Sequence, residues 1–294
     1  MDFVLTNWEH RLNVREQNAL RQHSALCHKS LAEFISIWPI LRSLVRSEQD
    51  LRLIVKAAIE SMVGTGITHV ELRSTVVGYA AALGVSQIDS IHLVGEIIRS
   101  EGAMQGIKSG LILSFDRGLA SSGIIHKVAP SLGDLYRNRS IIGIDITGDE
   151  EISEHESICM ATKEAKRCAI PITFHAGETG KVENIYRAVE HHGAQRIGHA
   201  TAIWNDRKIV DVLARNGVCV EVCITSNVVT GILSRPEEYP LNSLIAGGVP
   251  FVICSDNPAL LETSLEKERD IVAKHWGQCF VESSDQASIG HSFL

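Results

Sequence analysis

Seven short apolar runs recur along the chain, and each one ends in polar residues. Continuous apolar runs of this length are typical of strands that are buried on both faces of a parallel sheet. Segments with helical spacing lie between them, so the pattern predicts a repeated strand-then-helix order. The predicted strands cover residues 68–73, 110–114, 141–146, 172–175, 196–199, 218–222 and 251–255. The clearest predicted helices cover 86–99, 151–167, 184–192, 207–216 and 265–275.

A weaker apolar stretch at residues 3–5 would raise the strand count to eight, the number that closes a (β/α)8 barrel of the TIM type. An open doubly wound sheet is the alternative. No glycine-rich phosphate loop follows the first strand, so the dinucleotide-binding form of that sheet loses support. No Pro-, Gly- or Ser-rich linker interrupts the pattern. We therefore expect an α/β fold, a (β/α)8 barrel in one domain over residues 1–294.

Residues 30–62 are expected to form two helical pieces. Pro39 should end or kink the first piece, because a proline inside a helix removes a hydrogen bond and clashes with the preceding turn. Asp50 is the expected N-cap of the second piece, whose apolar residues repeat at helical spacing.

Composition and charge exclude several classes of protein. The chain has 294 residues, 45% of them apolar and 21% charged, which is the profile of a soluble globular protein with a large core. A net charge of −7 offers no global positive field for a nucleic acid backbone. No window approaches the roughly 18 to 20 apolar residues that a membrane span needs. Seven cysteines without a C-x-x-C pair predict buried thiols and, with no leader pattern, a cytoplasmic protein.

Polar residues follow most of the predicted strands. In a barrel the carboxyl ends of the strands converge on one mouth, so these side chains are candidates for chemistry. A lone histidine at a strand end is more often a hydrogen-bonded structural residue, but several aligned polar groups indicate a site. The candidates are Glu71, Arg73, Asp145, His175, Glu178, His199, Thr225, Ser226, Asn227, Asp256 and Asn257.

Three of these strand ends carry groups suited to hydrolysis. His175 and Glu178 are separated only by two small residues, an arrangement that suits a metal ligand beside a proton donor. His199 ends the next strand and can act as a base or as a ligand. Asp256 follows the last strand, where a carboxylate can bind a metal or orient a water molecule.

Six motifs resemble, in order and approximate spacing, those of the adenosine deaminase family. The similarity runs from about Leu31 to about Lys274, and it implies a (β/α) barrel enzyme that removes an amino group from a purine nucleoside or nucleotide with the help of zinc. The motifs are V-E-L-R-S (70–74), G-I-D-I-T-G-D-E (143–150), T-F-H-A-G-E (173–178), R-I-G-H-A (196–200), C-I-T-S-N (223–227) and C-S-D-N-P-A-L (254–260).

The resemblance assigns a role to each matching position. His175 is similar to a zinc-ligand histidine, and Glu178 to the acid that protonates the purine ring nitrogen beside the reacting carbon. His199 resembles the residue that helps to deprotonate the metal-bound water, and Asp256 resembles a carboxylate that contacts the metal and orients the hydroxide. Gly148 resembles a glycine whose backbone amide contacts the purine. Zinc lowers the pKa of bound water to about 7, which permits attack at neutral pH.

The first strand departs from the family, whose members carry an H-x-H there that supplies two zinc ligands. No H-x-H occurs in this chain, and laying residues 3–5 on that strand places Thr6 and Trp8 at the two histidine positions. His175 and Asp256 then supply two of the three ligands that a catalytic zinc normally needs. Trp8 is either a stacking wall of the substrate pocket or an ordinary core tryptophan.

Two further departures lie near the end of the chain. Asn257 stands where the family usually has a second aspartate that binds the purine; an amide can donate without being protonated, so we expect binding with altered selectivity. The chain continues only briefly after Trp276, so the family's final helix is expected to be short or missing.

Three functions remain open from the sequence. The first is a zinc-dependent purine deaminase, and the second is a metal-independent member that uses Glu178, His199 and Asp256 for acid-base chemistry on a small nitrogenous substrate. The third is a non-catalytic binding subunit, which a buried cluster of ionisable groups disfavours. The other polar residues are expected to be structural. Glu71 and Arg73 should form an ion pair or a hydrogen-bond network. Asp145 and Asp149 should brace the loop that contains Gly148, and Ser226 and Asn227 should orient His199 or Asp256.

Overall fold

The computed structural model describes residues 7–24, 30–75 and 78–294. This part of the chain divides into two compact units. One, called the β5–β7 unit, contains the described residues up to Leu44 together with Asp149–Glu151 and His175–Ser292. The other, called the β1–β3 unit, contains Val45–Gly148, Ile152–Phe174 and Phe293–Leu294. The strand expected at residues 3–5 lies outside the described residues, as does Thr6.

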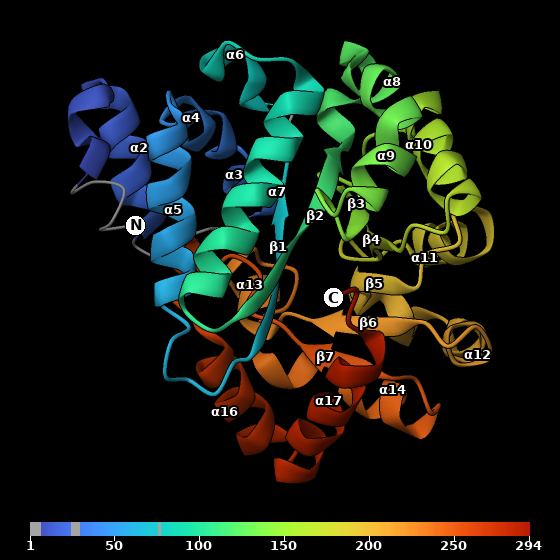
Figure 1. Ribbon diagram of the computed structural model, residues 1–294. Helices are drawn as coiled ribbons and strands as arrows, with labels where there is room; N and C mark the ends of the chain where they lie inside the picture. The colour runs from blue at the N-terminus through green and yellow to red at the C-terminus, as the bar shows by residue number, and fades with distance from the viewer. Residues whose placement is uncertain (1–6, 25–29, 76–77) are drawn as a thin grey trace. The chain divides into compact units, whose positions relative to one another are not determined.

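The β1–β3 unit is built on parallel strands in chain order (Figure 1). Its central strand β2 is buried over most of its length, as expected for a strand covered on both faces. The strands are β1 (His69–Ser74), β2 (Lys108–Asp116), β3 (Gly143–Thr147) and the first residues of β4 (Ile172–Ala176). The helices are α5 (Glu48–Glu60), α6 (Ala80–Leu83), α7 (Gln87–Met104), η3 (Arg117–Ser122), α8 (Ile124–Val128), η4 (Ala129–Ser131), α9 (Leu132–Arg137) and α10 (Glu156–Arg167).

The β5–β7 unit has three parallel strands, again in chain order. These are β5 (Arg196–His199), β6 (Cys219–Val222) and β7 (Phe251–Ile253). Its helices before β6 are η1 (Glu9–Arg11), α2 (Val14–Ser24), α3 (Leu31–Ile35), α4 (Trp38–Ser43), α11 (Val182–Tyr186), the π-helical turn η5 (Arg187–His191), η6 (Thr201–Asn205) and α12 (Arg207–Arg215). After β6 come α13 (Ile224–Val229), η7 (Pro236–Glu238), α14 (Leu241–Ala246), α15 (Pro258–Leu261), α16 (Leu265–His275) and α17 (Gln278–His291).

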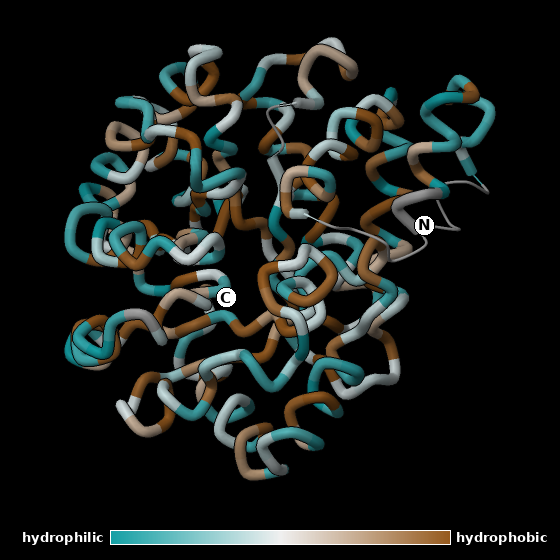
Figure 2. Tube along the Cα trace, turned by 180° about the vertical axis from the view of Figure 1, so that it is seen from behind, coloured by the Kyte–Doolittle hydropathy of each residue, from teal (hydrophilic) through white to brown (hydrophobic). Residues whose placement is uncertain are grey.

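All seven predicted strands are confirmed, and helices form in each of the predicted helical segments. In Figure 2, brown hydrophobic stretches and teal hydrophilic stretches alternate along the coils of the helices, as in amphipathic helices. The caps were less well predicted. Ser47, not Asp50, is the N-cap of α5, and its hydroxyl accepts the Asp50 N–H at 3.2 Å. Residues 30–62 form three helices, α3, α4 and α5, and not the two that were expected. Helix α3 already ends at Ile35, and Pro39 lies in the first turn of α4, where its missing N–H costs nothing.

The expectation of a short or missing final helix was wrong. Helix α17 has 14 residues and follows Gly277, whose φ of 108° ends the preceding helix. The helix buries Val281 and Ser284. The Ser284 hydroxyl accepts the Ile253 N–H at 2.9 Å and so ties α17 to β7. These buried positions do not form a regular apolar stripe in the sequence, which is why the periodicity missed them.

Two polar residues of β1, Glu71 and Arg73, each make a hydrogen bond to a residue far away in the sequence but in the same unit. Glu71 Oε1 accepts the Phe293 N–H at 2.5 Å. Arg73 donates to the Thr173 hydroxyl at 3.5 Å. The Phe293 ring packs where a Cβ on Gly143 would lie, 2.7 Å from a ring carbon. Glu71 and Arg73 therefore have structural partners here.

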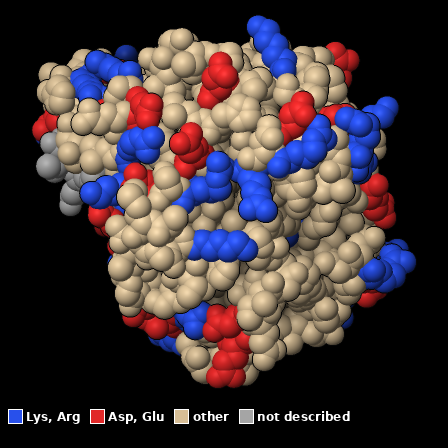
Figure 3. Space-filling model, in the orientation of Figure 1, with Lys and Arg blue, Asp and Glu red and all other residues tan. Residues whose placement is uncertain are grey.

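Charged residues of both signs lie beside one another on the face shown in Figure 3. Among the described helices, none is long and apolar enough to cross a membrane. None of the described cysteines forms a disulfide. Cys219 and Cys223 are buried, as predicted, whereas Cys159, Cys168 and Cys254 are half-buried and Cys279 is exposed, so the prediction of buried thiols was wrong for these four. Burial raises the pKa of the Cys219 thiol, and the hydrogen bond with Cys254, together with burial, raises that of Cys223.

Gly95 of α7 offers a test of the packing. A Cβ there would lie 2.1 Å from the Ser140 carbonyl oxygen, which belongs to backbone and cannot move aside cheaply. We expect Gly95→Ala to lower the free energy of unfolding by about 1–3 kcal/mol, the usual cost of overpacking. Gly290→Ala in α17 is the control, because nothing lies within 4 Å of its Cβ position. Gly290→Ala should raise the free energy of unfolding by about 0.5–1 kcal/mol. Urea unfolding measures both variants, and equal effects of the two substitutions would contradict the close packing of Gly95 against Ser140.

Candidate active site

Glu178 lies just after β4 in the β5–β7 unit, and its side chain is buried. Gly177 makes the turn before it with a φ of 72°, and a Cβ there would lie 2.5 Å from Ile185 Cδ1. Burial raises the pKa of the Glu178 carboxyl, while His199 and His175 lower it to a smaller extent. A carboxyl group in this environment keeps its proton at a higher pH than an exposed glutamate, which suits a proton donor.

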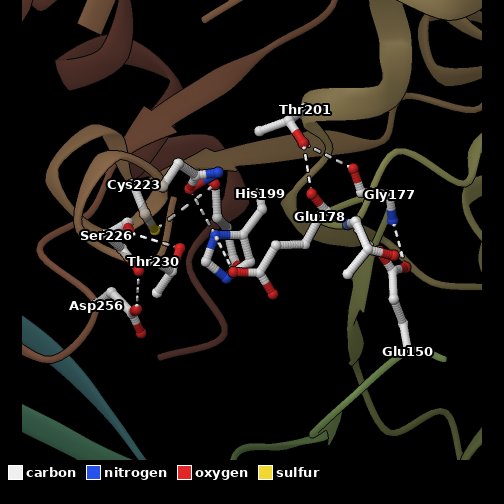
Figure 4. A network of polar contacts seen from close by, with 12 residues as sticks. Glu150, Gly177, Glu178, His199, Thr201, Cys223, Ser226, Thr230 and Asp256 are labelled. Carbon is white, nitrogen blue, oxygen red and sulfur yellow. Dashed lines mark hydrogen bonds and ion pairs between the residues drawn. The ribbon is translucent and has the colours of Figure 1, made fainter. Parts of the chain in front are cut away.

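Glu150 holds the backbone on both sides of Glu178. Its Oε2 accepts the Gly177 N–H at 2.8 Å and the Asn184 amide at 3.0 Å. Its Oε1 accepts both the backbone N–H and, at 2.8 Å, the hydroxyl of Thr179. A buried carboxylate with four donors is well satisfied. Figure 4 shows Glu150 reaching the Gly177 end of this loop.

His199 is the last residue of β5 and is only 3% exposed. Its Nδ1 lies 2.9 Å from the Asn227 Oδ1. The same nitrogen lies 3.7 Å from the Glu178 Oε1 (Figure 4). The buried Tyr239 hydroxyl donates to the His199 carbonyl oxygen at 2.5 Å. The His175 ring lies beside the His199 ring, with 5.3 Å between centroids. The predicted acid, base and histidine ligand are therefore neighbours.

Asp256 follows β7 and is exposed at this end of the strand. Its Oδ2 accepts from the Ser226 hydroxyl at 2.8 Å (Figure 4), and its Oδ1 accepts from the Asn257 amide at 2.8 Å. Ser226 comes from α13, which begins just after β6. The predicted contacts of Ser226 with Asp256 and of Asn227 with His199 are thus present in the structure.

The backbone is strained at two of the candidate catalytic residues, His199 and Asp256, and at Ala200. His199, Ala200 and Asp256 have φ values of 67°, 50° and 53°, a region that residues other than glycine enter rarely. Such strain persists only where surrounding contacts enforce it, and it concentrates at functional sites. The Tyr239 and Ser226 hydrogen bonds are contacts of that kind.

Gly148 belongs to the β1–β3 unit. Its φ is 88°, and its carbonyl oxygen accepts from Arg117 at 3.0 Å. A Cβ on Gly148 would lie 2.5 Å from the Asp116 carboxylate. The braces expected here were Asp145 and Asp149, but Asp145 accepts from Ser114 and Asp149 accepts from the Glu151 N–H. Asp116 and Arg117 are the neighbours that the sequence analysis missed, because no motif singled them out.

Trp8 stands in a helical turn just before η1, not in a strand. Its side chain is 3% exposed, and the Arg11 guanidinium lies over the ring at 5.7 Å from the centroid. This is the environment of a core tryptophan, the second of the two interpretations of Trp8.

The donor set does not fit a catalytic zinc. Such a site needs three protein ligands, and the chain has no H-x-H. Within the described residues of this unit, no three ligand atoms lie within 4.8 Å of one another among His175, Glu178, His199 and Asp256. The carboxylate of Asp256 is already hydrogen-bonded at both oxygens.

Acid and imidazole groups at the strand ends of a parallel α/β fold define the site of an α/β-barrel enzyme. The model of the adenosine deaminase family matches residues 9–292, so the chain belongs to that family and is an adenosine deaminase-like hydrolase. Adenine deaminase of Mesorhizobium japonicum is 27% identical over 255 residues, which is 87% of this chain and 78% of the relative.

Two solved structures show the fold. The N6-mAMP deaminase of Arabidopsis has a TM-score of 0.85 and 22% identity, covering 100% of this chain and 88% of that one. An amidohydrolase from Burkholderia ambifaria with bound Zn has a TM-score of 0.76 and 20% identity, covering 96% of this chain and 82% of that one. The predicted TIM-type α/β barrel class is confirmed.

Proposed function

We propose that this enzyme hydrolyses the exocyclic amino group of a purine base, nucleoside or nucleotide. Water and the amino-purine give the oxo-purine and ammonia. The single observation that carries the proposal is the buried Glu178, whose pKa is raised by burial and whose carboxyl lies 3.7 Å from His199. Membership of the adenosine deaminase family supports the substrate class.

Each of the three side chains has one role in this proposal. Glu178 donates its proton to the ring nitrogen next to the reacting carbon, which makes that carbon more electrophilic. His199 accepts one proton from the attacking water and passes it to the amino group, which leaves as ammonia when its bond to the ring carbon breaks. The second proton of that water returns to Glu178 as the carbonyl forms. Asp256, fixed by Ser226 and Asn257, accepts a hydrogen bond from the water and orients it toward the carbon.

Substrate contacts are proposed for Gly148 and Asn257 by their match to the family motifs. The half-buried Asn257 donates one amide hydrogen to Asp256, and its carbonyl oxygen and second amide hydrogen are proposed to select the purine. The family match runs across both units, which supports one domain. The free thiols suit the reducing cytoplasm, where we place the enzyme and its small-molecule substrate.

A second candidate is acid-base chemistry by the same residues without a metal, on an amino-purine or another small nitrogenous compound. The observation that favours it is the donor set of the active site: among the described residues, His175, Glu178, His199 and Asp256 do not bring three ligand atoms within 4.8 Å of one another. Zinc remains an expectation from the family resemblance, and the proposed reaction has no step that requires it. The two candidates differ in metal content and in the effect of chelation.

The test is release of ammonia from adenine, adenosine and AMP, and of methylamine from N6-methyl-AMP, by purified full-length protein. Metal content is measured by elemental analysis on the same sample. We expect turnover of at least one of these compounds. One zinc per active chain, with activity lost on chelation, would establish the metal-dependent deaminase; full activity without metal would establish the second candidate. Absence of turnover on every compound, with and without added zinc, would contradict purine deamination.

A further inference from the structure

The imidazole of His199 is held by Asn227, a residue to which the proposed reaction gives no role. Resting on the proposed function, we infer that Asn227 is a positioning residue: its carbonyl oxygen keeps the proton of neutral His199 on Nδ1 and leaves Nε2 as the atom that accepts the proton of water. The tautomer of a histidine is set in this way by the hydrogen bond that one of its ring nitrogens makes.

Both ends of His199 are restrained. Asn227 is fully buried in α13, and its Oδ1 lies 2.9 Å from the His199 Nδ1. The Tyr239 hydroxyl binds the His199 carbonyl oxygen, and the left-handed backbone at His199 and Ala200 fixes the direction in which the side chain leaves the strand. Rotation of the ring would break the Asn227 hydrogen bond inside a buried site, where an unmade hydrogen bond is costly because water cannot replace it.

Asn227 also separates the acid from the base. Glu178 Oε1 lies 3.7 Å from the same Nδ1, beyond hydrogen-bond distance, whereas the Asn227 Oδ1 lies at 2.9 Å. The Nδ1–H is therefore bonded to a neutral amide and not to the carboxyl group. This arrangement leaves the Glu178 proton available for the substrate.

The two ends of an amide have the same shape, so the opposite orientation must be tested. An Asn227 that donated through Nδ2 would bind a lone pair on Nδ1 and force the proton onto Nε2. That nitrogen could not then accept a proton from water. With Oδ1 toward His199, the buried Asn227 Nδ2 has no hydrogen-bond partner among the described residues, so the contacts of Asn227 do not choose between the two orientations. Replacement by Asp distinguishes the two orientations, because a carboxylate can only accept.

The experiment is ¹⁵N NMR of the full chain with labelled histidine, at a pH well above the ordinary imidazole pKa. The His199 signals are assigned by their loss in His199→Asn. In wild type and in Asn227→Asp, we expect the His199 imidazole to be protonated at Nδ1 and unprotonated at Nε2. Asn227→Leu should lose that preference, whereas Asn216→Leu, at an exposed helix end, should match wild type.

An unprotonated His199 Nδ1 in wild type would overturn the inference. So would a change of the His199 tautomer in Asn227→Asp. An unchanged His199 spectrum in Asn227→Leu would do the same, and Asn227→Asp decides the matter if the Leu variant does not fold. The NMR readout needs no turnover, so it stands apart from any failure of the proposed function. Where turnover is found, Asn227→Leu should lower kcat at least tenfold with KM unchanged.

Discussion

Glu178→Gln is expected to lower kcat for deamination by about a hundredfold to ten-thousandfold, the range over which a positioned general acid contributes. The glutamine keeps the size and polarity of the buried protonated acid, but it cannot transfer a proton to the purine ring nitrogen. KM should change little, because the amide can still donate a hydrogen bond to that nitrogen. Steady-state kinetics of the purified variant measures both parameters.

Glu183→Gln is the matched control, because Glu183 lies on the neighbouring helix α11 and is exposed. It should retain wild-type kcat. Glu178→Asp keeps an acid but shortens the side chain, so it should fall between wild type and the Gln variant. Equal rates for Glu178→Gln and wild type would rule out Glu178 as the proton donor.

Glu178→Gln is also expected to change how the free energy of unfolding depends on pH. The folded-state pKa of Glu178 is raised above its ordinary 4.5, so the stability contributed by the neutral acid is complete below 4.5 and is lost as pH rises through the folded pKa. Gln cannot ionise. Glu178→Gln should therefore gain stability relative to wild type as pH rises from 4.5, and urea unfolding at several pH values measures the difference.

Asp256→Asn is expected to lower kcat by about a hundredfold or more, because an amide cannot replace a carboxylate that orients and polarises water. The fold should survive. Asn tolerates the positive φ of 53° at this position, and its side-chain oxygen can still accept from Ser226. Kinetics should therefore show a large loss of kcat while the unfolding midpoint shifts by only a few degrees.

Asp270→Asn controls for the loss of one negative charge, since Asp270 is exposed on α16. It should leave kcat unchanged. A wild-type rate for Asp256→Asn would show that Asp256 does not act on the water. A variant that is inactive only because it has unfolded would be recognised by its unfolding curve.

The strands were predictable because each is an apolar run that is buried on both faces. Helix α17 was not, since its buried positions, Val281 and Ser284, include only one apolar side chain and leave no periodic signal. The N-cap of α5 was misplaced by three residues because Ser47 and Asp50 are both good capping residues, and only the backbone conformation separates them.

The strand-end rule located Glu178, His199 and Asp256 without knowledge of the fold. It could not find Tyr239, which reaches the His199 carbonyl from the loop before α14, because no local pattern links two residues 40 positions apart. Glu150 lay inside a recognised motif, but its four donors come from residues about 30 positions later. Long-range hydrogen bonds of this kind leave no mark on hydrophobic periodicity.

The most direct measurement is mass spectrometry of the purine product formed in ¹⁸O-labelled water by wild type and by Glu178→Gln. Hydrolytic deamination by this site predicts an oxo-purine that carries one oxygen from solvent, formed with an equal amount of released amine, and strongly reduced formation by the variant. A product without solvent oxygen, or equal amounts of product from wild type and variant, would contradict the assignment of purine deamination to Glu178, His199 and Asp256.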